Sequence, residues 1–83
     1  MNVPDWLARH DGALRQGLSA DTWFVLFHGE PEYRLSVHPA GGAFTCSIIQ
    51  TANGKRLDQG KRYPTVQAAL DGGLEELRAQ LGW

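Results

Sequence analysis

Residues 63–83 read YPTVQAALDGGLEELRAQLGW, and this stretch predicts the helix around which the rest of the chain is organised. Thr65 is placed to cap a helix that begins at about Val66, because its hydroxyl can accept a hydrogen bond from a backbone N–H one turn further on. Gly82 is placed to close the helix in the left-handed conformation. Apolar residues recur at spacings of three and four and therefore share one face, namely Val66, Leu70, Leu74, Leu77 and Leu81. The helix presents one apolar stripe that needs a partner surface.

Two adjacent glycines, Gly72 and Gly73, interrupt this helical pattern. Each costs about 1 kcal/mol relative to alanine within a helix, so something must offset them. We expect the helix backbone to approach a sheet closely at this point, because only glycine leaves room for such contact. The alternatives are a kink and a site that exposes the backbone.

The first part of the chain also has a helical pattern. Residues Asn2 to Leu18 predict a first helix, with Pro4 tolerated in the opening turn and Asp5 near the positive end of the helix dipole. Apolar residues follow a loose period of three to four, although Gly12 and Gly17 weaken the pattern. We expect this helix, too, to bury one side.

Between the helices, the sequence predicts antiparallel strands. Runs rich in aromatic and β-branched residues are separated by turn signals, and the expected strands are Thr22 to His28, Tyr33 to His38 and Phe44 to Thr51, with a short fourth strand at Lys55 to Leu57. The order of elements therefore predicts an α+β fold of two layers: an N-terminal helix, a three- or four-stranded antiparallel meander, and a C-terminal helix, with both helices on one face.

Period-two alternation assigns the two faces of the sheet. The inward face is predicted to carry Trp23, Val25, Phe27, Tyr33, Leu35, Val37, Phe44, Cys46 and Ile48. The opposite face is mostly polar or small, but it also carries Phe24, Leu26 and Ile49. No further element of the chain is free to cover these three apolar residues.

The composition limits what the protein can be. The chain has 83 residues, a formal net charge of -1 and one cysteine, Cys46. This length suits a single modest core, so we expect residues 1–83 to form one small domain. One cysteine cannot form an intramolecular disulfide, and no stretch approaches the roughly 18 apolar residues of a membrane span. We therefore expect a soluble, cytoplasmic protein with no membrane contact.

The side chains with metal-binding or nucleophilic character are His10, His28, His38 and Cys46, and none of them has the spacing of a known site. No serine stands in the Gly-x-Ser-x-Gly context of a hydrolase nucleophile. A domain of this size also has difficulty forming the pocket of roughly 300 Å³ or more in which small molecules usually bind. The sequence therefore predicts a protein that is not an enzyme and that binds neither a cofactor nor a metal.

Four cations lie close together in the sequence: Lys55, Arg56, Lys61 and Arg62. Such a cluster can contact phosphates, so the alternative function is a nucleic-acid-binding module that uses this basic segment. We favour instead charges that protect an edge strand, because no exposed aromatic residues interleave with the cations. The order of elements resembles the double-stranded RNA-binding domain, but Thr65 to Leu70 lacks the lysine cluster that this family carries at the start of its last helix.

The exposed sheet face provides the leading functional hypothesis. Phe24, Leu26 and Ile49, beside Arg34, predict a contact patch. Its occupant would be a protein partner or a second copy of the chain, since a two-fold dimer formed face to face would cover the patch. Scattered apolar surface residues are also normal in monomers. We therefore predict a non-enzymatic protein-interaction or self-associating module.

Overall fold

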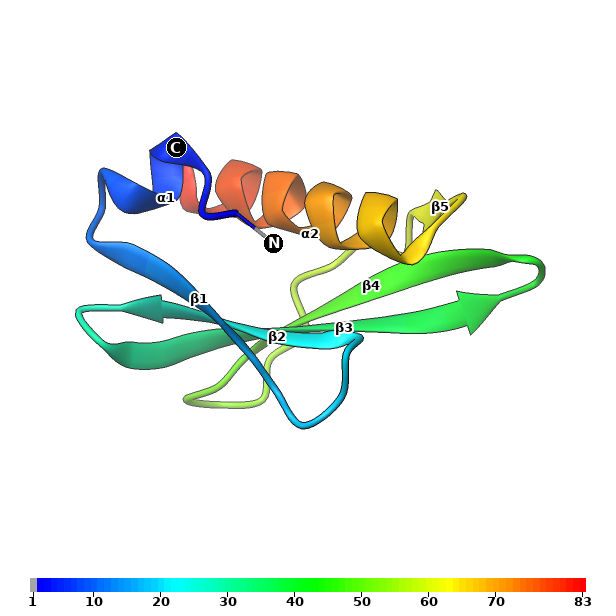
Figure 1. The fold of residues 1–83 in the computed structure, drawn as a ribbon, viewed down its shortest axis with the longest axis horizontal. Coiled ribbons are helices and arrows are strands. Elements are labelled where there is room, and N and C mark those ends of the chain that lie inside the picture. The colour runs from blue at the N-terminus through cyan, green and yellow to red at the C-terminus, as the bar shows by residue number, and fades with distance from the viewer. Residues whose placement is uncertain (1) are drawn as a thin grey trace.

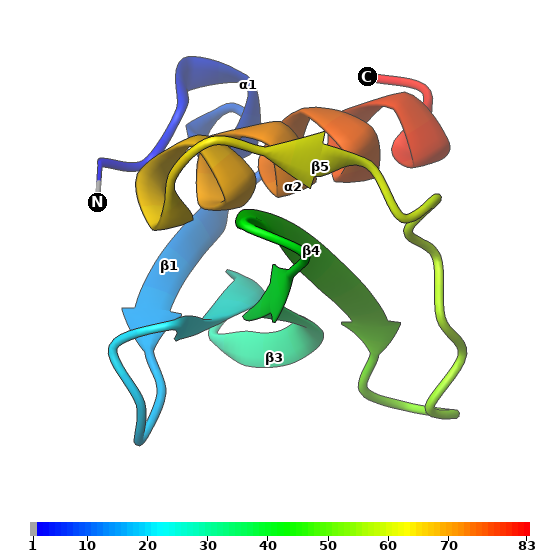
Figure 2. The same ribbon diagram turned by 90° about the vertical axis from the view of Figure 1, so that its right-hand side faces the viewer.

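The computed structural model describes residues 2–83 and has two layers, with helices on one side of a single sheet (Figures 1 and 2). The sheet has five antiparallel strands whose order in space follows the chain. The elements in order are α1 (Asp5–Ala8), β1 (Gly12–Gln16), β2 (Thr22–Phe27), β3 (Glu30–Ala40), β4 (Ala43–Gln50), β5 (Arg62–Tyr63) and α2 (Val66–Leu81). The predicted α+β class and the meander are confirmed.

Helix α2 begins and ends where its sequence predicts. The Thr65 hydroxyl accepts a hydrogen bond from the backbone N–H of Ala68 at 3.0 Å, and Gly82 closes the helix with a φ of 74°. Cap and closing glycine satisfy backbone groups that a helix end otherwise leaves unpaired. The apolar stripe of α2 packs on the sheet, where Leu70, Leu74 and Leu77 are buried.

The two glycines of α2 lie where other elements press against the helix, as expected. A Cβ atom on Gly73 would lie 2.6 Å from Sγ of Cys46 on β4, and one on Gly72 would overlap the ring of Tyr63 on β5. No side chain fits in either place. The cost of two glycines within the helix is thus offset by close helix–sheet packing.

The predicted N-terminal helix from Asn2 to Leu18 is wrong except for one turn, Asp5–Ala8, which begins after an extended Pro4. Helix α1 ends at Ala8, Asp11 adopts a left-handed φ of 57°, and Gly12–Gln16 forms strand β1. The helical spacing was overridden because β1 pairs along its length with β2, whereas Gly12 and Gly17 would each have weakened a helix. The loose helical spacing was therefore a misleading signal.

The strands expected at 22–28, 33–38 and 44–51 are confirmed as β2, β3 and β4, with β3 longer at both ends. The fourth strand expected at Lys55 to Leu57 is wrong, because only an isolated bridge joins Ile49 to Arg56. The pairing stops there because the carboxylate of Asp58, rather than a backbone carbonyl, accepts the N–H of Ile48 at 3.0 Å. Strand β5 forms the edge instead, so the sheet has five strands rather than three or four.

The core lies between α2 and the inward face of the sheet. The predicted inward set supplies its sheet side: Val25, Leu35, Val37, Cys46 and Ile48 are buried, while the aromatic residues Trp23, Phe27, Tyr33 and Phe44 pack partly buried around them. Leu7 of α1 is also fully buried in this core. Period-two alternation therefore identified the correct face, and the opposite face, here called the outer face, points away from both helices.

Candidate interaction surface

Five residues form a line across the outer face, four of them on consecutive strands and one on the segment that follows β4. Register partners run from Arg15 on β1 to Phe24 on β2, Arg34 on β3 and Ile49 on β4, and an isolated bridge continues from Ile49 to Arg56. Directly opposite residues of antiparallel strands share one face, so these side chains lie on the same side of the sheet. We call this set the arginine row.

Arginine and apolar side chains alternate along this row. Neighbouring strands lie about 4.8 Å apart, so successive arginines of the row stand about 10 Å from one another, with one apolar side chain between each pair. The guanidinium carbon of Arg15 lies 5.8 Å from the ring centroid of Phe24, which places it over the aromatic face. The row thus combines positive charge with apolar contact area.

One arginine of the row has an acidic partner. The Nε atom of Arg56 donates to both carboxylate oxygens of Asp58, at 2.8 and 3.0 Å, and its Nη2 donates at 2.9 Å. The Asp58 side chain is only 1% exposed. Burial opposes its ionisation, but hydrogen bonds from Arg56 and from the N–H of Ile48 outweigh that effect and keep the pKa of Asp58 below its usual value.

The other two arginines of the row keep their charge available. Arg15 and Arg34 are exposed. The ion pairs within residues 2–83 join His28 to Asp11, Arg56 to Asp58, and Arg78 to Glu75, and none of them involves Arg15 or Arg34. The guanidinium groups of these two arginines can therefore donate hydrogen bonds to a carboxylate or phosphate of another molecule.

The apolar patch predicted on this face is more buried than expected. Phe24 and Ile49 are half-buried, and Leu26 is only 8% exposed. The ladder between β2 and β3 shifts after Val25, so that Leu26 pairs with Pro31, while Ala13 of β1 flanks it on the other side. Because β1 is a strand, Leu26 has a neighbour on each side, and it supports the surface rather than forming part of it.

The four clustered cations do not form one patch. Arg56 joins the arginine row, with exposed Lys55 beside it. Arg62 on β5 is opposite Thr45, which is opposite His38 on β3, so Arg62 lies further along the outer face. Lys61 instead lines a cleft beside α2. The basic segment and the apolar patch thus meet only at Arg56.

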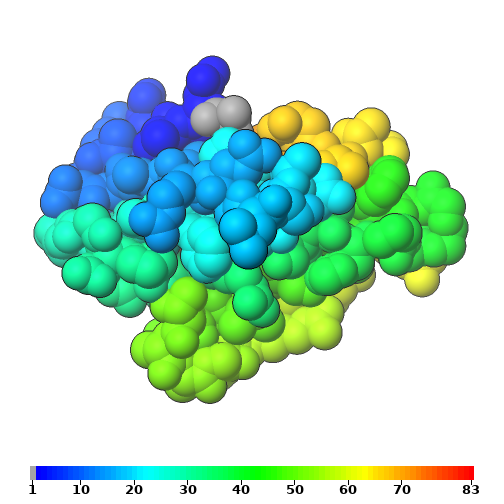
Figure 3. All heavy atoms as spheres, turned by 60° about the horizontal axis from the view of Figure 1, so that its bottom comes forward, coloured from blue at the N-terminus to red at the C-terminus, as the bar shows by residue number. Residues whose placement is uncertain are grey.

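Two chain segments flank the outer face. The turn between β1 and β2 and the segment that follows β4 both extend beyond the sheet on the side away from the helices (Figure 1). In the space-filling view, light blue and yellow-green mark these segments (Figure 3). A partner on the outer face would therefore meet both segments as well as the row.

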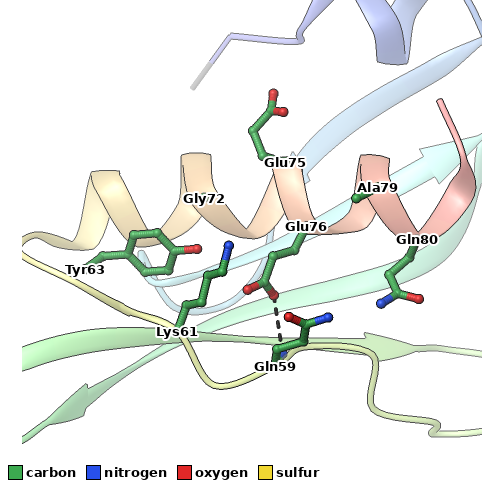
Figure 4. A pocket seen from close by; sticks show the side chains of 8 residues that line it. All are labelled: Gln59, Lys61, Tyr63, Gly72, Glu75, Glu76, Ala79 and Gln80. Atoms are coloured by element: carbon green, nitrogen blue, oxygen red, sulfur yellow. Dashed lines mark hydrogen bonds between the residues drawn. The ribbon is translucent and has the colours of Figure 1, made fainter.

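The cleft beside α2 has a volume of about 210 Å³ and is lined by Gln59, Lys61, Tyr63, Gly72, Glu75, Glu76, Ala79 and Gln80 (Figure 4). One carboxylate oxygen of Glu76 accepts a hydrogen bond from the backbone N–H of Gln59 at 3.5 Å, and the other is buried without a partner. Lys61 extends along the same cleft (Figure 4). This cleft is separate from the arginine row.

The candidate nucleophile and metal ligands lie apart. Within residues 2–83, no three His, Cys, Asp or Glu side chains gather in a group suited to a metal ion. His28 pairs with Asp11, whereas His10 stacks on Trp83 with ring centroids 3.6 Å apart. Burial raises the pKa of the Cys46 thiol to about 12, which keeps it protonated at neutral pH.

Sequence reasoning missed Arg15, because a residue of an expected helix could not be aligned with a sheet. Residues 12–16, Gly-Ala-Leu-Arg-Gln, do not alternate in polarity, so no local pattern marked this segment as a strand. The pairing of Arg34 with both Phe24 and Ile49 likewise depends on strand register, which short-range patterns do not determine.

No helix within residues 2–83 combines the length and the apolar character needed to cross a membrane. Comparison of the chain with protein-family models, with curated proteins and with solved structures finds no match.

Proposed function

We propose that the protein is a protein-interaction module that binds an acidic partner through the outer face of its sheet. The observation that carries this proposal is the arginine row, in which Arg15, Arg34 and Arg56 alternate with Phe24 and Ile49. Arginine and aromatic residues are enriched in protein interfaces. Carboxylates of a partner would pair with the guanidinium groups of Arg15 and Arg34, because Asp58 already pairs with Arg56. Apolar side chains of the partner would cover Phe24 and Ile49.

Charge favours a different protein over a second copy of the chain. In a face-to-face dimer centred on Arg34, a two-fold axis along the row would set every arginine against its own counterpart. An axis along the strands would set Arg34 against its counterpart, and Arg15 against Arg56 of the other copy, whose charge Asp58 partly offsets. Like charges brought together in an interface are unfavourable, so self-association through this face is the weaker hypothesis.

The available groups also favour an acidic protein over nucleic acid. A platform for single-stranded nucleic acid stacks bases on exposed aromatic rings. The aromatic residue of the row, Phe24, is half-buried and already has Arg15 over its ring. The whole chain carries a net charge of -1 and lacks the overall positive charge that drives most phosphate binding.

The test is a titration with a synthetic peptide that alternates valine and glutamate, in which isothermal calorimetry measures the binding. We expect binding that weakens about tenfold or more for Arg34→Glu, since a tenfold change corresponds to about 1.4 kcal/mol. The matched control is Arg9→Glu, which makes the same charge change on an exposed residue at the end of α1. A peptide of valine and serine should bind far more weakly.

Several results would contradict the proposal. Equal losses for Arg34→Glu and Arg9→Glu would indicate general attraction rather than a site on the outer face. Stronger binding to a single-stranded oligonucleotide than to the acidic peptide would favour the nucleic-acid alternative. A stable dimer that Phe24→Asp dissociates would favour the second copy.

A further inference from the structure

Within the part of the chain that the structure describes, β1 has a free edge, because it is the first strand in the sheet order. The other edge is formed by β5, a two-residue strand that packs against α2. Strand β1 contains no proline, and its pairing with β2 runs without a register shift over all five residues. It is therefore the edge that is regular enough to accept another strand.

Two hydrogen bonds at the ends of β1 reveal which of its backbone groups face β2. The N–H of Gly17 donates to the carbonyl of Thr22 at 2.8 Å, and the N–H of His28 donates to the carbonyl of Asp11 at 3.2 Å. In an antiparallel ladder, paired residues alternate between bonded and non-bonded pairs. Odd-numbered residues of this segment therefore form the bonds to β2.

The backbone N–H and C=O groups of Gly12, Leu14 and Gln16 consequently point toward the free edge. Within residues 2–83, the backbone groups of these three residues form no hydrogen bond with a turn, loop or helix end. A Cβ atom on Gly12 would overlap Leu7 of α1, so the inner face is occupied beside Gly12, and we place the pairing of a partner at Leu14 and Gln16. Here the half-buried Leu14 side chain faces the core, while exposed Arg15 faces outward at the end of the arginine row.

We infer that an extended segment of the acidic partner adds to this edge as a sixth strand, antiparallel to β1. This inference rests on the proposed function, because the charge on Arg15 selects the segment. Backbone pairing would supply the affinity and alternate side chains the specificity, as in other cases of strand addition. The segment would place acidic side chains on the outer face beside Arg15 and apolar side chains on the inner face beside Leu14.

The geometry determines which N–H groups of the added segment form hydrogen bonds with β1. Residues directly opposite each other share a face, so apolar residues of an antiparallel segment are opposite Leu14 and Gln16. Their N–H groups would point at β1, whereas those of the acidic residues would point to solvent. For the valine–glutamate peptide, N-methylation of the valines should abolish binding, and N-methylation of the glutamates should leave it nearly unchanged.

The first experiment measures amide exchange by NMR on residues 1–83, without and with this peptide. We expect the amides of Leu14 and Gln16 to exchange at least about tenfold more slowly with the peptide bound, because each gains a hydrogen bond. The neighbouring amides of Ala13 and Arg15 already face β2 and serve as the internal control. Binding without protection of Leu14 and Gln16 overturns the inference.

A second experiment changes the edge itself. Gln16→Pro removes an N–H that faces the free edge and leaves the bonds to β2 in place, whereas Gln16→Ala keeps that N–H. We expect the proline variant to lose binding and the alanine variant to retain it. If Gln16→Pro fails to fold, the N-methylated peptides give the same answer with the unaltered protein.

The two proposals fail in different ways. Binding that depends on Arg34 but tolerates N-methylated valines rejects strand addition and keeps the outer-face proposal. Binding that protects Leu14 and Gln16 but is indifferent to Arg34→Glu keeps strand addition and rejects the arginine row. A peptide that does not bind overturns both.

Discussion

Arg15 on β1 lies directly opposite Phe24 on β2, with its guanidinium carbon 5.8 Å from the centre of the Phe24 ring. This pair joins the edge of the sheet to its outer face. The cation covers an apolar ring that would otherwise meet water, and the ring holds the guanidinium group over the sheet.

The Arg15–Phe24 pair should contribute measurably to the stability of the fold. We expect a double-mutant cycle with Arg15→Met and Phe24→Leu to give a coupling of about 0.5–1 kcal/mol, the range for exposed cation–π pairs. Urea unfolding of the wild type, both single variants and the double variant measures it. Strict additivity of the two substitutions would show that the pair is only a steric contact.

Asp58 should make stability depend on pH at the acid end. Its pKa is lowered in the folded state from an ordinary value of 3.8, so its ionisation stabilises the fold above that value. This contribution is complete above about pH 5 and is lost as the pH falls through the lower folded pKa. Unfolding by urea should therefore show a steeper loss of stability below pH 4 in the wild type than in Asp58→Asn.

At neutral pH, Asp58→Asn should cost about 2 kcal/mol, since it weakens buried hydrogen bonds to a charged group. The control is Asp71→Asn, which removes an exposed helical carboxylate that accepts a hydrogen bond from Gln67. The control should lose less than 1 kcal/mol. Equal effects of the two substitutions would contradict the role assigned to Asp58.

A side chain at position 73 should destabilise the fold because it would clash with the Cys46 sulfur, and shortening Cys46 should relieve this clash. A Cβ atom at Gly73 would lie 2.6 Å from the Cys46 sulfur, so Gly73→Ala should cost about 1–3 kcal/mol despite the better helix propensity of alanine. Combining it with Cys46→Ala removes the sulfur, and the pair should cost less than the sum of the single changes. Thermal unfolding of the three variants tests this, and a fully additive result would place the clash elsewhere.

The Cys46 thiol should be unreactive in the folded protein. It is buried, and burial raises its pKa to about 12, so almost no thiolate is present near pH 8. We expect reaction with a thiol-specific chromogenic reagent only at the rate of unfolding, with an increase in urea. Immediate reaction under native conditions would mean that the helix leaves the sheet easily at Gly73.

The solution mass should correspond to a monomer over a wide range of concentrations, because the arginine row opposes face-to-face pairing of two copies. Light scattering or sedimentation at low and at moderate salt measures this. A dimer that grows at high salt, where repulsion between arginines is screened, would point to self-association through the outer face.

Local patterns were sufficient for the parts of the chain whose structure depends on near neighbours. The capped, striped helix at 66–81 follows from a hydroxyl at Thr65, a glycine at position 82 and apolar residues spaced by one helical turn. The inward and outward faces of β2 to β4 follow from the strict alternation of side chains along a strand. Both patterns depend on residues that are close together in the chain, so they can be recognised in a single sequence.

Tertiary structure decided what local patterns leave open. Residues 12–16 became a strand because β2 was available to pair with them, and Lys55 to Leu57 made only one bridge because Asp58 took the next N–H of β4. These outcomes depend on which segments meet across the sheet and in which register. The fold class and the core face were therefore determined by the sequence pattern itself, whereas the alignment of Arg15, Arg34 and Arg56 in one row required long-range backbone pairing.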